Sequence, residues 1–219
     1  MATILCLETA TTNCSVALSV DGSVTAFRED RSSGYSHAEK LHPFIAEVLQ
    51  EAKIDKSELD AIAVSKGPGS YTGLRIGVSA AKGLCFALGL PLISVPTLAS
   101  MTKQIKDDYD FIVPMLDARR MEVYSAVFNS EKIEVRETRA EILNEDSYAE
   151  LLSRGRIVFL GNGVEKFRGI NQHPNATFIV DAMPSAVDMA DVAERKYKKS
   201  DIEDVAYFEP YYLKDFISG

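Results

Sequence analysis

The sequence predicts an α/β protein with mixed sheets, and two patterns carry this prediction. Apolar, β-branched runs joined by short turns open the chain, which is typical of a meander of antiparallel strands. Helical periodicity then alternates with short apolar runs, as it does in layered α/β folds. The 219 residues lie between one and two typical domains, and the charged segment KDDYD at 106–110 interrupts the pattern. We therefore expect an N-terminal lobe over 1–106 and a smaller C-terminal α/β lobe over 107–219.

The elements expected in the first lobe are marked by start and stop signals. A tight turn at Asp21 and Gly22 separates two of its strands. Ser36 and Glu39 form a capping-box pattern before the first helix, and Pro43 inside that helix should bend its first turns. We expect strands at 3–8, 14–20, 23–30, 60–66 and 91–95, and helices at 36–52, 71–89 and 97–106.

The second lobe repeats this alternation more loosely. Three strands joined by short turns, followed by alternating helices and strands, favour a mixed sheet over a purely parallel one. We expect strands at 111–117, 122–129, 132–138, 156–160 and 177–180, and helices at 144–153, 163–169 and 186–197.

The composition excludes several classes of function. With 46% hydrophobic and 26% charged residues, the chain is of the globular type. Its 24 Lys and Arg against 32 Asp and Glu give a net charge of -8, which disfavours a surface that binds nucleic acid by itself. Cys6, Cys14 and Cys85 lie in apolar stretches without CxxC spacing, so we expect buried thiols rather than a zinc or disulfide framework.

The sequence also predicts a cytoplasmic protein without a membrane segment. The most apolar run, CFALGLPLISVP, is broken by Gly89 and Pro91 and is shorter than the roughly 20 residues that cross a bilayer. The beginning of the chain has no basic segment and carries Glu8, unlike a signal peptide.

The segment SKGPGSYTGLRIGVSAAKG at 65–83 is the most informative part of the sequence. Gly67 and Gly69 lie in a turn between a strand and a helix, where backbone amides can approach an anion closely. No Gly-Lys-Ser/Thr sequence closes the turn, so it is not a Walker loop. A structural turn and a phosphate site are both open interpretations.

In the helix that follows, Gly73, Gly77 and Ala81 recur every four residues. They form a stripe that another backbone can approach closely, with Leu74 and Val78 beside it. Two interpretations are open: the stripe packs against the chain's own sheet, or it forms a helix contact between subunits. In the second case, Gly77→Leu should abolish partner binding and leave the fold intact.

Other polar residues have both structural and functional interpretations. Glu8 ends the first strand, where a carboxylate can hold a metal or a nucleotide hydroxyl, although a hydrogen-bonded turn accounts for it as well. Asp117 lies among charged residues around a turn, as an ion-pair cluster or as a site. His37 and His42 are five residues apart, so they cannot share a metal from one helix face, and we expect solvated or capping histidines.

Four segments together resemble the TsaB (YeaZ) family: LCLETATTNCSVAL at 5–18, HAEKLHP at 37–43, DAIAVSKGPGSYTGLRIGVSAAKGLCFALGLPLISVPTL at 60–98 and LDARRMEVY at 116–124. The GPGSYTGLRIG core is highly specific. A weaker likeness in LGNGVEKF at 160–167 and EPYYLK at 209–214 extends the resemblance to nearly the whole chain. It implies the two-lobed actin-like ATPase fold (ASKHA, RNase H-like) that sugar kinases and Hsp70 share.

The resemblance also implies a function. TsaB proteins are the non-catalytic partners of TsaD, in a complex that transfers threonylcarbamoyl from threonylcarbamoyl-AMP to adenosine 37 of tRNAs that read ANN codons. We therefore expect TsaD and the ATPase TsaE as partners, tRNA bound through the complex, and a homodimer when the chain is alone. The complex would use ATP and a metal, with no cofactor bound by this subunit.

We expect the contact with TsaD on the helices at 36–52 and 71–89. The residues assigned to this contact are Leu41, Ile45, Val48, Gly73, Leu74, Gly77, Val78 and Ala81. The residues assigned to a possible nucleotide site are Glu8, Gly67, Gly69 and Asp117.

Two departures from related sequences argue against catalysis by this subunit. Thr97 and Met101 stand where TsaD-type sequences carry an HxxxH metal pair, and neither offers an imidazole. Glu8 stands where actin-like ATPases usually carry an aspartate in their first phosphate loop, and its extra methylene would crowd a nucleotide. The alternatives are an autonomous actin-like ATPase or kinase acting through Glu8, the glycine loop and Asp117, and a glycoprotease-like peptidase.

Overall fold

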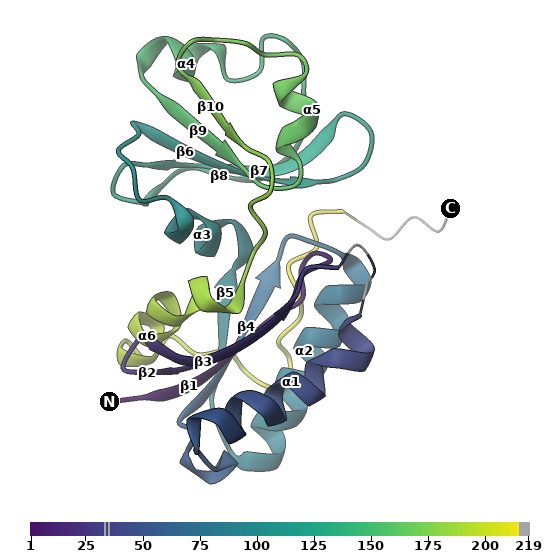
Figure 1. Cartoon of the computed structure of the whole chain (residues 1–219), viewed down its shortest axis with the longest axis vertical. Helices are drawn as coiled ribbons and strands as arrows, with labels where there is room; N and C mark the ends of the chain where they lie inside the picture. Colours follow the sequence, from purple (N-terminus) through teal and green to yellow (C-terminus); the bar gives the residue numbers. More distant parts are fainter. Residues whose placement is uncertain (33, 35, 215–219) are drawn as a thin grey trace. The chain divides into compact units, whose positions relative to one another are not determined.

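The chain forms two compact units, each with its own sheet (Figure 1). The computed structural model describes residues 1–214 apart from 33 and 35. Unit 1 comprises Met1–Ser100 with Pro184–Gly219, and unit 2 comprises Met101–Met183. The expected C-terminal lobe over 107–219 is therefore too long, because the chain returns to unit 1 after Met183.

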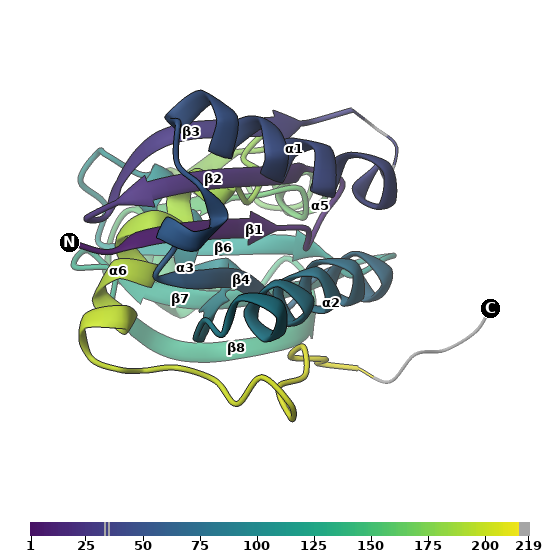
Figure 2. The ribbon, with the colours of Figure 1, turned by 90° about the horizontal axis from the view of Figure 1, so that it is seen from below.

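The sheet of unit 1 has five strands: β1 (Thr3–Glu8), β2 (Cys14–Val20), β3 (Ser23–Asp30), β4 (Ala61–Gly67) and β5 (Leu92–Pro96). Their order is β3-β2-β1-β4-β5, and Figure 2 shows β3, β2, β1 and β4 side by side. β1 pairs antiparallel with β2 and parallel with β4, and β4 pairs parallel with β5. The predicted meander and the mixed sheet are both confirmed.

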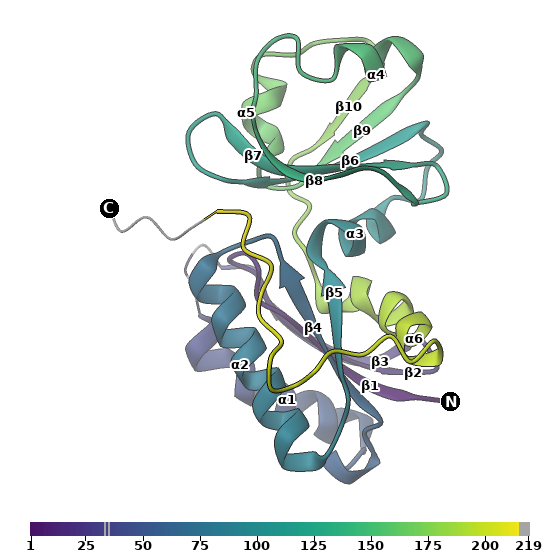
Figure 3. The same ribbon diagram turned by 180° about the vertical axis from the view of Figure 1, so that it is seen from behind.

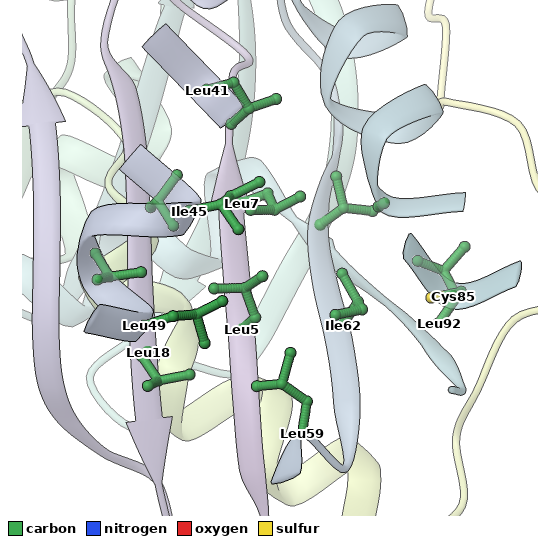
Figure 4. Close-up of a cluster of buried hydrophobic side chains, with 14 of the residues drawn as sticks. Leu5, Leu7, Leu18, Leu41, Ile45, Leu49, Leu59, Ile62, Cys85 and Leu92 are labelled. Carbon is green, nitrogen blue, oxygen red and sulfur yellow. The ribbon is translucent and has the colours of Figure 1, made fainter. Parts of the chain in front are cut away.

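One face of this sheet packs against two helices, α1 (His37–Ala52) and α2 (Tyr71–Leu88). Side chains alternate between the faces of a strand, so Leu5 and Leu7 of β1 point to the same side. There they meet Leu41 and Ile45 of α1 (Figure 4). Deep burial of such aliphatic side chains contributes roughly 1.5–3 kcal/mol each, which makes this face the main core of unit 1.

The opposite face of the sheet is covered by the returning C-terminal segment. It forms a short 3₁₀ helix η3 (Ala186–Met189) and then α6 (Ala190–Lys198), where a single helix over 186–197 was expected. Ala186 and Met189 pack against Ile4 and Cys6 of β1. This apolar contact accounts for the return of the chain to unit 1.

The two large helices begin differently from one another. Ser36 is the N-cap residue of α1, but its hydroxyl donates to Asp30 Oδ2 over 2.7 Å and makes no cap bond, so the predicted capping box is wrong. Pro43 lies inside α1, which continues through it. The hydroxyl of Ser70 caps α2, and Gly89 ends α2 in the left-handed conformation, with φ 68°.

After β5 the chain forms a short helix α3 (Thr97–Met101) and a 3₁₀ helix η2 (Thr102–Gln104). These two elements replace the single helix expected at 97–106. A further 3₁₀ helix, η1 (Lys56–Glu58), precedes β4 and was not predicted. No helix in the described part of the chain is long and apolar enough to span a membrane.

Unit 2 has a second five-stranded mixed sheet, in the order β10-β9-β6-β7-β8. Its core contains an aromatic cluster: the ring centroids of Phe159 and Phe167 lie 4.9 Å apart, and those of Tyr148 and Phe159 lie 5.2 Å apart. The strand β8 and the helix α4 begin later than expected. The elements are β6 (Phe111–Asp117), β7 (Glu122–Asn129), β8 (Glu134–Ile142), α4 (Ala149–Arg154), β9 (Ile157–Leu160), α5 (Val164–Arg168) and β10 (Ala176–Ile179).

Candidate functional site

The glycine-rich segment brings the N-terminal half of α2 into backbone contact with the turn after β1. A Cβ atom built on Gly69 would lie 2.4 Å from the carbonyl oxygen of Ala10, and one built on Gly73 would lie 2.1 Å from that of Thr9. At Gly77 it would lie 2.2 Å from Thr9 Oγ1. Any side chain at these three positions would therefore displace α2 from the sheet.

Hydrogen bonds fix this contact. Thr9 Oγ1 donates to the carbonyl of Gly73 over 2.8 Å, and the Ser70 amide donates to the carbonyl of Ala10 over 2.6 Å. His37 Nε2 lies 2.7 Å from the carbonyl oxygen of Thr11. His37 is buried rather than solvated or capping as expected, and burial lowers the pKa of its imidazole. His42 is exposed, as expected.

The residues assigned to partner contact from the sequence are buried in unit 1. The stripe of small residues packs against the chain's own sheet, so the intersubunit interpretation of the stripe is wrong, and the residues beside it belong to the main core. Every assigned residue is buried, and the assigned residues other than glycine are at most 4% exposed. The set is Leu41, Ile45, Val48, Gly73, Leu74, Gly77, Val78 and Ala81.

Glu8 is fully buried at the end of β1. Its Oε1 accepts hydrogen bonds from the Ala10 amide over 2.6 Å and from the Ser65 hydroxyl over 2.8 Å. Its Oε2 has no hydrogen-bond partner among the described residues. Burial raises the pKa of Glu8 to about 7, and the two hydrogen bonds at Oε1 only partly oppose this.

The glycines of the possible nucleotide site do not form an open anion cradle within unit 1. Gly67, with φ 106°, faces the carbonyl oxygen of Tyr211, which lies 2.8 Å from where a Cβ would be. The amide of Ser70 donates to Ala10, so it is engaged within the chain. Asp117 belongs to unit 2, where it accepts a hydrogen bond from Lys166 Nζ over 2.7 Å. The glycine loop thus serves packing within unit 1.

The thiols and the positions aligned with a metal pair are also buried. Cys6, Cys14 and Cys85 are free and buried, as predicted. Thr97 and Met101 have no exposed surface. Within residues 1–214 and outside the gaps at 33 and 35, no group of three His, Cys, Asp or Glu side chains is placed to hold a metal.

The outward side of α1 and α2 carries a shallow apolar groove of about 530 Å³. Phe86, on the same helix α2, is 88% exposed. Sequence reasoning missed this groove, although Ile76, Ala80 and Leu84 recur every four residues just beside the buried stripe. The groove is lined by His42, Arg75, Ile76, Ser79, Ala80, Gly83 and Leu84. An exposed apolar groove of this kind is typical of a surface that binds another protein.

Comparison of the sequence with known proteins gives long matches. Residues 31–215 match the model of the family described as TsaD: tRNA N6-adenosine threonylcarbamoyltransferase. The tRNA threonylcarbamoyladenosine biosynthesis protein TsaB of Escherichia coli is 30% identical, over 98% of this chain and 96% of its own. The Haemophilus influenzae protein of the same name is 29% identical, over 99% and 95%.

Solved structures give the same result for the fold. YeaZ from Pseudomonas aeruginosa has a TM-score of 0.81 at 27% identity, over 97% of this chain and 100% of its own. Component A of the Acidaminococcus fermentans (R)-2-hydroxyglutaryl-CoA dehydratase has a TM-score of 0.53, over 92% of this chain and 100% of its own. Its identity is 11%, so this likeness concerns the fold alone.

We predict that Gly77→Leu destabilises the fold, because its side chain would enter the space of Thr9. The free energy of unfolding should fall by about 3 kcal/mol or more, since overpacking at a backbone contact cannot relax easily. Gly83→Ala is the matched control on the exposed side of α2, where a Cβ meets nothing within 4 Å. It should stabilise the protein by about 0.5–1 kcal/mol through helix propensity. Urea denaturation of both variants tests this, and an unaltered midpoint for Gly77→Leu would contradict the packing.

A second prediction concerns the pH dependence of stability. The folded protein holds the proton of Glu8 more tightly than the unfolded chain does. The contribution of Glu8 is therefore fully present below pH 4.5, the ordinary pKa of a glutamate, and is lost as the pH rises through about 7. Glu8→Gln keeps an acceptor and cannot ionise. Relative to wild type, this variant should gain about 2–3 kcal/mol in free energy of unfolding between about pH 4 and about pH 8. Denaturation curves at both pH values measure this gain, and a constant difference would refute it.

Proposed function

Because the chain belongs to the TsaB family, we propose that it is a scaffold subunit in the biosynthesis of tRNA N6-threonylcarbamoyladenosine, and that it binds and activates TsaD. The fold is α/β of the actin-like ATPase type, with mixed sheets. The single observation that carries the proposal is the apolar groove on α1 and α2, with Phe86 exposed on the same helix. Exposing apolar surface to water is unfavourable, so such a groove is typical of a chain that binds a partner there.

The buried polar groups support a non-catalytic role. The carboxyl of Glu8 is fully buried, so a metal or a phosphate-bound water does not reach it from solvent, and its Oε1 already accepts two hydrogen bonds from the chain itself. The turn at Gly67 and Gly69 is filled by neighbouring backbone. These residues therefore do not fit a nucleotide, and we derive no catalytic step from them.

The TsaD contact proposed here lies on the same two helices as the sequence predicts, but on their outward side. The groove has an apolar floor of Ile76, Ala80 and Leu84, with His42 and Arg75 as polar residues. An amphipathic helix of the partner, with an apolar stripe and an acidic residue, has the complementary chemistry. We expect the chain alone to self-associate through the same surface, because a second copy would cover it when TsaD is absent.

The docking proposal predicts that Ser79→Arg weakens TsaD binding. Ser79 is exposed and lines the groove, so the change places a long cation there without removing a core contact. We expect roughly ten- to a hundredfold weaker binding, as for truncation or blocking of a central interface position. Ser130→Arg, at an exposed turn of unit 2, is the matched control. Calorimetry with TsaD from the same organism, and a tRNA modification assay with each subunit omitted, measure the effect. Wild-type affinity of Ser79→Arg would place the docking surface elsewhere.

The scaffold role also predicts weak binding of tRNA by the chain alone. A net charge of -8 gives no electrostatic gain against a polyanion. Gel-shift titration at physiological salt should show much weaker binding for the lone chain than for the complex. Equal affinities, or ATP turnover by the lone chain that Glu8→Ala abolishes, would favour an autonomous enzyme instead.

A further inference from the structure

The last described residues of the chain form an extended segment beside α2 (Figures 2 and 3). We call residues 203–212 the C-terminal strap. The strap contains most of the EPYYLK motif at 209–214. Val205 and Phe208 of the strap pack against the main core of unit 1, so the strap is anchored rather than loosely attached.

Backbone and side-chain hydrogen bonds hold the strap along its length. The Glu203 amide donates to the carbonyl of Leu92 at the edge of the sheet, over 2.8 Å. Lys82 of α2 donates through Nζ to the carbonyl oxygens of Ala206 and Phe208, over 3.1 and 3.0 Å. The strap thus connects the outer edge of β5 to the flank of α2.

The end of the strap fixes one residue of the groove. The Tyr212 ring lies 5.0 Å from the Tyr71 ring, and its hydroxyl accepts a hydrogen bond from Arg75 Nε over 3.3 Å. The Arg75 guanidinium also lies 4.2 Å over the Tyr71 ring. An exposed arginine ordinarily samples many rotamers, and these two contacts restrict Arg75 to few of them.

Arg75 has unused capacity for a partner. Among the described residues, no carboxylate forms an ion pair with it. A guanidinium has five N–H donors, and only Nε is engaged by Tyr212, so the two terminal nitrogens are left to bind a carboxylate.

We propose that Tyr212 is a positioning residue of the docking surface, which holds Arg75 at the groove for a carboxylate on the apolar helix of a partner. This inference rests on the proposed docking of TsaD. Holding the side chain in place before binding reduces the entropy lost on association. Tyr212 and Arg75 meet at an exposed site, so their contact has little effect on the stability of the fold.

A double-mutant cycle tests the inference. Tyr212→Phe removes the acceptor for Arg75 Nε and keeps the ring against Tyr71, and Arg75→Gln removes the guanidinium. We expect Tyr212→Phe alone to weaken TsaD binding about three- to tenfold, with an unchanged melting temperature. In the Arg75→Gln background, Tyr212→Phe should have no further effect, because it acts only through Arg75. Tyr207→Phe is the matched control, since Tyr207 is a strap tyrosine that is 84% exposed.

A spectroscopic measurement on the lone chain separates this inference from the docking proposal. The Arg75 Nε–H resonance should shift and exchange faster with water in Tyr212→Phe. An unshifted resonance, or full TsaD affinity of Tyr212→Phe while Ser79→Arg still weakens binding, overturns the positioning role and leaves the docking surface intact. If Ser79→Arg binds TsaD normally, the docking proposal fails, and the role of Tyr212 in docking fails with it. An equal loss in the Arg75→Gln background would show that Tyr212 acts independently of Arg75, which also overturns the inference.

Discussion

Gly69, just before α2, and Gly73 and Gly77 within it lie against the turn after β1, and this close approach determines where the rest of α2 lies. The Thr9 hydroxyl stabilises this contact by donating a hydrogen bond to the carbonyl of Gly73. A helix normally packs 8–10 Å from its neighbour because side chains keep the backbones apart. Glycine removes that spacing, so α2 is held close to the sheet by its inner face and presents its outer face to solvent.

The inner face of α2 therefore packs in the core, and its outer face lines the groove. Val78, Ala81 and Cys85 complete the core against the sheet. Ile76, Ala80 and Leu84, one step around the helix, form the floor of the groove. This division explains how a helix with so many small residues is tightly packed on one side and carries an apolar groove on the other, because the two stripes lie side by side and not on the same line.

The C-terminal part of the chain supports both faces of the first sheet. Its helical segment buries Ala186 and Met189 against one face, and the strap then passes along the edge of β5 to the flank of α2. An uncovered edge strand is a site of unwanted pairing, and the bridge between Leu92 and Glu203 protects it locally. One face and one edge of the first sheet are thus covered by residues that are distant in sequence from its strands.

The sequence alone determined the elements whose signals are local. The strands at 3–8, 14–20 and 23–30 have the predicted bounds, because apolar, β-branched runs and the turn at Asp21 and Gly22 depend only on neighbouring residues. The family and its fold followed from the resemblance. The partner of the Ser36 hydroxyl could not be assigned this way, because its hydrogen bond to Asp30 depends on where β3 ends in space.

Only the tertiary structure decided which backbone meets the glycine stripe. A face of small residues has the same pattern whether it packs on the chain's own sheet or on a partner, and Thr9 is 64 residues away from Gly73 in the sequence. The same holds for His37, which is buried because Thr11 lies beside it, and for the return of residues 184–214 to unit 1. Each of these outcomes is a long-range contact, and periodicity and spacing along the chain carry no information about the partner in such a contact.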